Sequence, residues 1–184
     1  MDVGYGATVG DRCVISGDNV TIGALASTGT DCRIGARTVI ARSASFGSGA
    51  VLGDDVVIGP SVVAGDNVEL GARTRLRKDV QLGDDVSLGE DGRIGRGAIL
   101  EQGVEGGDDV QIGSRAQVGA YTVLLPGEVV LRGVVIEPSD PPEDDSVVIH
   151  SRGQRPQRRR SHPHRRSRAG LVHGRRCADL RRLL

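Results

Sequence analysis

Four basic side chains at a fixed spacing are the first residues in this sequence that suggest chemistry. Arg75 and Arg93 lie eighteen residues apart, and so do Lys78 and Arg96. Guanidinium and ammonium groups bind phosphate oxygens through charge-assisted hydrogen bonds. If residues eighteen apart stack on one another, these side chains form a positive patch that could hold the phosphate groups of a ligand. The competing interpretation is charge balance on an acidic surface, without a ligand.

Histidine, the commonest general base near neutral pH, does not occur in the first 149 residues. The four histidines are His150, His162, His164 and His173. A catalytic centre before residue 150 would therefore need another proton acceptor, and a three-histidine zinc site is excluded there.

A six-residue repeat from Ile22 to Ile136 produces these spacings. Position one of the repeat is residue 22 and every sixth residue after it. Of these 20 residues, 17 are large aliphatic or aromatic residues, and 14 precede a glycine. Position five is small or β-branched, as in Ala44 and Val56. A fixed period must be explained before any single helix or strand is assigned.

Within the repeat, residues alternate between inward and outward positions. Residues 80–83, Val-Gln-Leu-Gly, have the alternation of a short strand with one buried face. Positions three and four hold residues that favour turns, such as Asp54 and Asp55. A chain that turns a corner every six residues can form neither a hairpin sheet nor an amphipathic helix. The repeat therefore predicts a triangular prism of stacked strands, which begins in another register at Val3 with one extra residue before Ile22.

This pattern resembles the hexapeptide-repeat, acyltransferase-like family, whose fold is a left-handed parallel β-helix with three hexads per coil. The resemblance covers most of residues 3–136. It implies an all-β solenoid of about seven coils over residues 1–140 and assembly as a homotrimer. The left hand comes from the resemblance. A right-handed solenoid is the alternative, although such solenoids usually have irregular coil lengths.

The resemblance also implies transfer of an acetyl or longer acyl group from a coenzyme A or carrier thioester to a sugar or amine. Arg75, Lys78, Arg93 and Arg96 would then bind the phosphates of coenzyme A. Family members generally use a coil histidine as the base and often carry a loop that builds the acceptor pocket; both are missing here, which argues against catalysis. The remaining candidates for the base are the carboxylates Glu101, Glu105 and Glu128.

A non-catalytic β-helical scaffold or assembly subunit is the alternative function. Such a protein would bind partners through the flat prism faces and the uncovered ends of the rod. Acetyl-CoA binding favours the first hypothesis, whereas filaments or a stable protein partner favour the second.

Composition changes abruptly after the repeats. Residues 151–184 contain 12 of the 24 basic residues and one of the 24 acidic residues, which leaves 12 basic and 23 acidic residues before them. We therefore expect residues 141–184 to be a disordered, Pro- and Arg-rich tail. It could bind nucleic acid, dock on the acidic rod, or derive from out-of-frame reading of GC-rich DNA. It lacks interleaved aromatic residues, so base stacking is unsupported.

Two further clusters have a functional and a structural interpretation. Asp66, Asp84 and Asp85 could bind a cation between adjacent coils, but exposed charge ladders explain them equally simply. Cys13 and Cys32 occupy position five about one coil apart, where buried small residues are expected instead of a disulfide or metal pair. We predict no metal site.

No apolar run approaches the eighteen or so residues that span a membrane, and residues 1–4 lack the features of a signal peptide. The sequence therefore predicts a cytoplasmic protein. The aromatic content of 2% suits a thin prism filled with Ile, Leu and Val.

Overall fold

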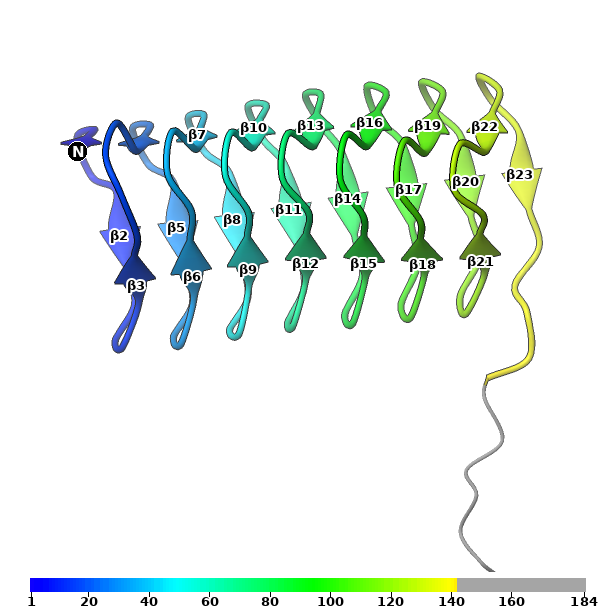
Figure 1. The fold of residues 1–184 in the computed structure, drawn as a ribbon, viewed down its shortest axis with the longest axis horizontal. Helices are drawn as coiled ribbons and strands as arrows, with labels where there is room; N and C mark the ends of the chain where they lie inside the picture. The colour runs from blue at the N-terminus through cyan, green and yellow to red at the C-terminus, as the bar shows by residue number, and fades with distance from the viewer. Residues whose placement is uncertain (142–184) are drawn as a thin grey trace, which may run out of the picture. The chain divides into compact units, whose positions relative to one another are not determined.

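The computed structural model describes residues 1–141, which wind into a three-sided rod of 23 two-residue strands. In Figure 1 the front strands β3 (Val14–Ile15) and β6 (Arg33–Ile34) run upward, while the rear strands β2 (Thr8–Val9) and β5 (Ser27–Thr28) run downward. Because the axis meanwhile advances from left to right, the parallel β-helix is left-handed. The predicted fold class is confirmed.

Every third strand belongs to the same sheet. Sheet A comprises β1 (Asp2–Val3), β4 (Thr21–Ile22), β7 (Val39–Ile40), β10 (Val57–Ile58), β13 (Arg75–Leu76), β16 (Arg93–Ile94), β19 (Gln111–Ile112) and β22 (Val129–Val130). Sheet B comprises β2, β5, β8 (Ser45–Phe46), β11 (Val63–Ala64), β14 (Gln81–Leu82), β17 (Ile99–Leu100), β20 (Gln117–Val118) and β23 (Val135–Ile136). Sheet C comprises β3, β6, β9 (Val51–Leu52), β12 (Glu69–Leu70), β15 (Ser87–Leu88), β18 (Glu105–Gly106) and β21 (Val123–Leu124).

Adjacent strands in each sheet are parallel, and beyond the first coil they pair in an eighteen-residue register. Val57 lies beside Arg75, and Arg75 lies beside Arg93. The strands make seven complete coils and two strands of an eighth, so the expected number of about seven was slightly low. In the first coil the offset is nineteen, as for Val3 and Ile22, which places the predicted extra residue at the corner before β4.

The core is the column of residues at positions one and five. Ile40, Ile58 and Val56 are fully buried, and they stack directly on their counterparts in the next coils. Thr38 and Thr74 also point inward, and each hydroxyl donates to a backbone carbonyl, that of Gly53 and Gly89 respectively (3.0 Å each). These hydrogen bonds remove the cost of burying a hydroxyl group.

Position four of each hexad adopts a left-handed backbone conformation at the corner. Sixteen such residues other than glycine have φ between 55° and 62°, including Arg37, Arg73 and Asp91. This conformation costs roughly 1–2 kcal/mol for an L-residue. The backbone N–H of Arg73 donates to the carbonyl of Asp54 in the preceding coil (2.8 Å), and the same bond recurs at other corners. Stacking between coils therefore stabilises the conformation.

The glycines at position two allow the corners of neighbouring coils to approach closely. A Cβ atom on Gly71 would lie 2.5 Å from the carbonyl carbon of Gly89 and 2.6 Å from the backbone nitrogen of Glu90. Neither contact can be relieved by a side-chain rotation, because both involve backbone atoms.

The irregular coil around Gly106 is packed and leaves no space for a ligand. A Cβ on Gly106 would lie 2.7 Å from Cδ2 of Leu88, and one on Gly103 would lie 2.6 Å from the ring of Tyr121. Gly107 is covered in the same way by Pro126. Small residues here make room for larger neighbours.

The predicted tail from residue 141 falls almost entirely outside the described residues, as do the four histidines and Cys177. The predicted domain boundary therefore stays a prediction. Within residues 1–141 we find no helix that could span a membrane.

We predict that Gly71→Ala destabilises the rod by about 3 kcal/mol, because the added methyl group collides with backbone. Gly127→Ala is the control: its φ is also positive, at +75°, but nothing lies within 4 Å of the added Cβ. We expect this second change to cost only about 1 kcal/mol. Chemical denaturation measures the free energy of unfolding of both variants. Equal losses of stability would contradict the explanation that a Cβ on Gly71 collides with the backbone of the next coil.

Candidate functional site: two grooves on the faces of the rod

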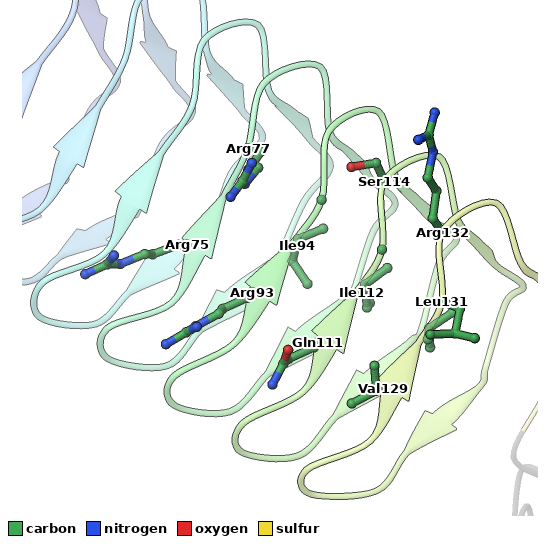
Figure 2. A pocket seen from close by; sticks show the side chains of 13 residues that line it. Arg75, Arg77, Arg93, Ile94, Gln111, Ile112, Ser114, Val129, Leu131 and Arg132 are labelled. Atoms are coloured by element: carbon green, nitrogen blue, oxygen red, sulfur yellow. The ribbon is translucent and has the colours of Figure 1, made fainter.

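Sheet A carries a basic groove of about 500 Å³ near the C-terminal end of the rod. Arg75, Arg93, Gln111 and Val129 are successive outward residues of β13, β16, β19 and β22, so the register places their side chains in one row. Figure 2 shows this row, with Arg77 and Arg132 on the segments that follow β13 and β22.

The arginines of this groove make no ion pair with any carboxylate of residues 1–141. This holds for Arg75, Arg77, Arg93 and Arg132. Four guanidinium groups on one short stretch of surface repel one another. The groove is therefore a positively charged region without a direct ion-pair partner, although, beside Arg73, both Arg75 and Arg93 help to lower the pKa of nearby Asp91. An anion would stabilise it.

The structure separates the four basic residues expected to act together. Arg75 and Arg93 stand side by side in the groove, as predicted. Lys78 and Arg96 lie at the following corner and do not line the groove, and Nζ of Lys78 is 3.3 Å from the carboxylate of Asp79. Arg77 and Arg132 were missed. Arg77 occupies position two, where glycine prevails, and that departure was the available signal. Arg132 occupies position three, where the repeat offers no such signal.

Three arginines at position four, by contrast, form ion pairs between adjacent coils: Arg12, Arg37 and Arg73. Arg37 pairs with Asp55 through two hydrogen bonds (2.7 and 2.6 Å), and Arg73 pairs with Asp91 (2.8 Å) and with Glu90 (2.5 Å). Hydrogen bonds from Arg37 and Arg73 lower the pKa of Asp55 and Asp91, respectively. These charge ladders account for Arg37 and Arg73. Arg33 and Arg115 also make no ion pair within residues 1–141, so the groove is set apart by the number of arginines that line it.

The lowered carboxyl pKa values predict a pH dependence of stability. A carboxylate with a depressed folded-state pKa contributes stability above its ordinary pKa of about 3.9, and this contribution disappears as the pH falls through the depressed value. Arg37→Gln and Arg73→Gln should therefore be less stable than the unmodified chain at pH 6, and this difference should shrink as the pH falls below about 3.9.

Thermal unfolding across this pH range provides the measurement. Arg33→Gln is the matched control, since Arg33 is exposed but makes no ion pair within residues 1–141. If Arg37→Gln or Arg73→Gln lowered the unfolding temperature at pH 6 only as much as Arg33→Gln does, the charge ladders would not contribute to stability.

Sheet B carries a second, acidic groove of about 600 Å³. Val63, Gln81 and Ile99 form its floor as successive outward residues of β11, β14 and β17. Asp84 and Glu101 line its edge. The carboxylate of Glu101 is held by the backbone N–H of Ala120, which donates to Oε2 (3.1 Å).

The three candidate bases lie in different parts of the rod. Glu101 is the only one that lines a groove; Glu105 points outward from sheet C, and Glu128 precedes β22. Oε2 of Glu128 accepts a hydrogen bond from the backbone N–H of Leu125 (2.8 Å). Its carboxylate therefore stabilises the turn between β21 and β22. The structure therefore brings no two of these carboxylates together.

Several acidic residues have a structural role that sequence reasoning missed. An aspartate at position three accepts a hydrogen bond from a backbone N–H of the preceding coil. The pairs are Asp54 with Ala36 (2.8 Å), Asp66 with Ser48 (2.7 Å), Asp84 with Asp66 (2.9 Å) and Asp108 with Glu90 (2.8 Å). Recurrence of Asp at eighteen-residue intervals was the signal. Within residues 1–141 no three potential ligands are grouped around a metal position.

The two cysteines of the described rod are free thiols in inward positions. Cys32 is buried and Cys13 is half-buried. The thiols of Cys32 and Cys13 both donate to the carbonyl oxygen of Gly29, at 3.4 and 3.2 Å respectively. Burial raises the pKa of Cys32, so this thiol is held in its unreactive protonated form.

Comparison with known proteins agrees with this geometry. The family described as "Hexapeptide repeat of succinyl-transferase" matches residues 26–63. This match supports the predicted resemblance to hexapeptide-repeat proteins within the matched segment. No curated protein sequence matches this chain.

Among solved structures, a UDP-N-acetylglucosamine O-acyltransferase from Moraxella catarrhalis shares the fold. It has 17% sequence identity and a TM-score of 0.51, and the match covers 72% of this chain and 66% of that one. A UDP-N-acetylglucosamine acyltransferase from Francisella novicida matches at 20% identity, coverage of 73% and 58%, and a TM-score of 0.40.

A hexapeptide transferase family protein from Anaplasma phagocytophilum matches at 22% identity, coverage of 72% and 76%, and a TM-score of 0.37. The chain therefore spans 58% to 76% of the length of these three structures. At 17% identity and a TM-score of 0.51, the likeness to the Moraxella catarrhalis structure shows the fold alone.

Proposed function

We propose that this hexapeptide-repeat protein transfers an acyl group from a phosphate-bearing thioester donor to an amine or hydroxyl acceptor. The observation that carries the proposal is the sheet A groove, which four arginines line without an ion-pair partner among residues 1–141. The acyl-transferring activity in the names of the structural neighbours supports the same class of reaction.

Coenzyme A has the chemistry that this groove would bind. Its pyrophosphate and 3′-phosphate present oxygens to guanidinium groups, which bind such oxygens in two-pronged, charge-assisted hydrogen bonds. Arg75 and Arg93 are adjacent strand residues, so one phosphate can contact both. Val129 and Leu131, exposed by 54% and 68%, provide apolar surface in the same groove for the uncharged part of the donor.

The transfer requires a proton acceptor, and Glu101 is our choice because it is the candidate that lines a groove. The acceptor nitrogen or oxygen attacks the thioester carbonyl carbon and forms the new C–N or C–O bond while the C–S bond breaks. Glu101 takes the proton lost by the acceptor, and the departing thiolate gains a proton from solvent. The bond from Ala120 fixes one carboxylate oxygen and leaves the other for this role.

The donor groove and Glu101 lie on different faces of one rod, so they can meet only where two copies pack side by side. A parallel trimer would place sheet A of one copy against sheet B of the next around a threefold axis. A homotrimer therefore belongs to the proposal, and sedimentation equilibrium measures it directly.

We predict that Arg93→Gln weakens coenzyme A binding about tenfold, because one charge-assisted contact worth about 1.5 kcal/mol is lost. Arg75→Gln should behave alike. Isothermal titration calorimetry with coenzyme A gives the affinities, and Arg33→Gln, an equal loss of charge on sheet C, should bind like the unmodified chain. An equal loss of coenzyme A affinity in all three variants would indicate only a general effect of charge. It would contradict the proposal that the groove is the donor site.

Glu101→Gln should lower the turnover number about 100-fold and leave donor affinity unchanged. Glutamine keeps the oxygen that Ala120 contacts but cannot take a proton. Thiol release from acetyl-CoA with a panel of amines measures turnover, and Glu105→Gln is the control on sheet C. Unchanged turnover in Glu101→Gln would remove this residue from the proposed mechanism.

A further inference from the structure

Two inward cysteines on adjacent coils form a pair for which the proposed function has no role. Val14 pairs with Arg33 in sheet C, so the residues just before them, Cys13 and Cys32, lie side by side on the first and second coils. The backbone N–H of Val14 donates to the carbonyl oxygen of Cys32 (2.8 Å), which holds the two segments together at this point. Both side chains point into the rod, where Cys32 belongs to the core and Cys13 packs against it.

The two sulfur atoms converge on one carbonyl oxygen. Sγ of Cys13 lies 3.2 Å from the oxygen of Gly29, and Sγ of Cys32 lies 3.4 Å from the same atom. Strands in one sheet are about 4.8 Å apart, and disulfide-bonded cysteines have Cα atoms about 4.4 to 6.8 Å apart. The two side chains can therefore be joined by rotation about their Cα–Cβ bonds, with the register of the coils unchanged.

Solvent reaches one of the two thiols more easily than the other. Cys13 is half-buried, whereas Cys32 is 1% exposed. Burial also raises the pKa of Cys32, which disfavours direct oxidation of this thiol. A small oxidant would therefore react first with Cys13, and Cys32 is the only other cysteine of the described rod.

The first coil is the part of the rod where a covalent link would add most. Its inward residues are incompletely covered, since Val3 is 47% exposed and Ile15 is half-buried. Their partners in the second coil, Ile22 and Ile34, are each 1% exposed. Because less apolar surface is removed from water, packing stabilises the first coil less than the second. A disulfide to the second coil would restrict the unfolded chain and so offset this difference.

We propose that Cys13 and Cys32 are a thiol oxidation site, at which a peroxide links the first two coils through a reversible disulfide. Hydrogen peroxide converts the thiol of Cys13 into a sulfenic acid and is reduced to water. The sulfur of Cys32 then loses its proton and attacks the Cys13 sulfur, so that the S–S bond forms, the S–O bond breaks and a second water leaves. A dithiol reductant, which is itself oxidised to a disulfide, restores both cysteines. Neither cysteine lines the sheet A or the sheet B groove, so this inference and the proposed function can fail independently.

The test uses the full chain with Cys177→Ser, so that the two cysteines of the pair are the only ones left. Trypsin cleaves after Arg12 and Arg33, and the peptide between these sites, residues 13–33, carries both sulfurs. After treatment of the folded chain with hydrogen peroxide, we expect this peptide to lose the mass of two hydrogen atoms and to regain it with dithiothreitol. The oxidised chain should melt about 5 °C higher than the reduced chain.

Cys32→Ala in the same background is the matched control. Alanine fits this position, because Ala50 is buried at the equivalent place in the next coil. The control should show neither the loss of two hydrogen atoms nor the rise in melting temperature. The inference is overturned if the chain with both cysteines keeps its thiols or gains oxygen instead, or if the disulfide joins two chains. An oxidised chain that melts no higher than the oxidised control would overturn it as well.

Discussion

Hydrogen bonding between coils in a constant register is the constraint on which the rest of this structure depends. Each strand contributes only two residues, too few for an independent sheet, and each coil is held by its neighbours. The backbone N–H of Gly53 donates to Leu70 one coil later (2.8 Å), and the N–H of Gly71 donates to Leu88 in the same way (2.8 Å). Because this spacing never changes after the first coil, one residue type can be repeated along a column to build a surface.

The same stacking determines the chemistry of corners and faces. At the corners, neighbouring coils bring residues such as Arg37 and Asp55 into contact, so charges are neutralised in pairs. On the flat faces, side chains project into solvent in parallel rows. Arg75 and Arg93 therefore remain unpaired within the described rod, and sheet B can place Gln81 between two apolar residues. Four arginines without a direct ion-pair partner along one groove distinguish the candidate donor site from the structural charge ladders.

The sequence predicted the fold to a large extent because its signal is spread over many hexads. Ile58, Val56 and Gly59 fall where position one, position five and the close-packed corner require them. The pairing of Arg75 with Arg93 followed from the same period. The period also predicted contact columns such as the one that joins Asp55 to its neighbours.

The site was less predictable because grooves depend on where the row of side chains changes size and charge. Arg77 joins the donor groove from a position that is usually glycine and Arg132 from the position after it, whereas Lys78 turns toward Asp79. Hydrogen bonds to backbone N–H groups, such as the one that holds Glu101, depend on side-chain rotation as well as spacing. Apart from the missing glycine at Arg77, the period gave no direct indication of these features.

A crystal structure of the full chain with coenzyme A would test the central claim most directly. The account predicts phosphate oxygens within hydrogen-bonding distance of Arg75 and Arg93, with the uncharged part of the molecule running toward Val129 and Leu131, and a neighbouring copy presenting Glu101 to the thiol end. Coenzyme A bound on another face, or at a groove that no second copy completes, would contradict it.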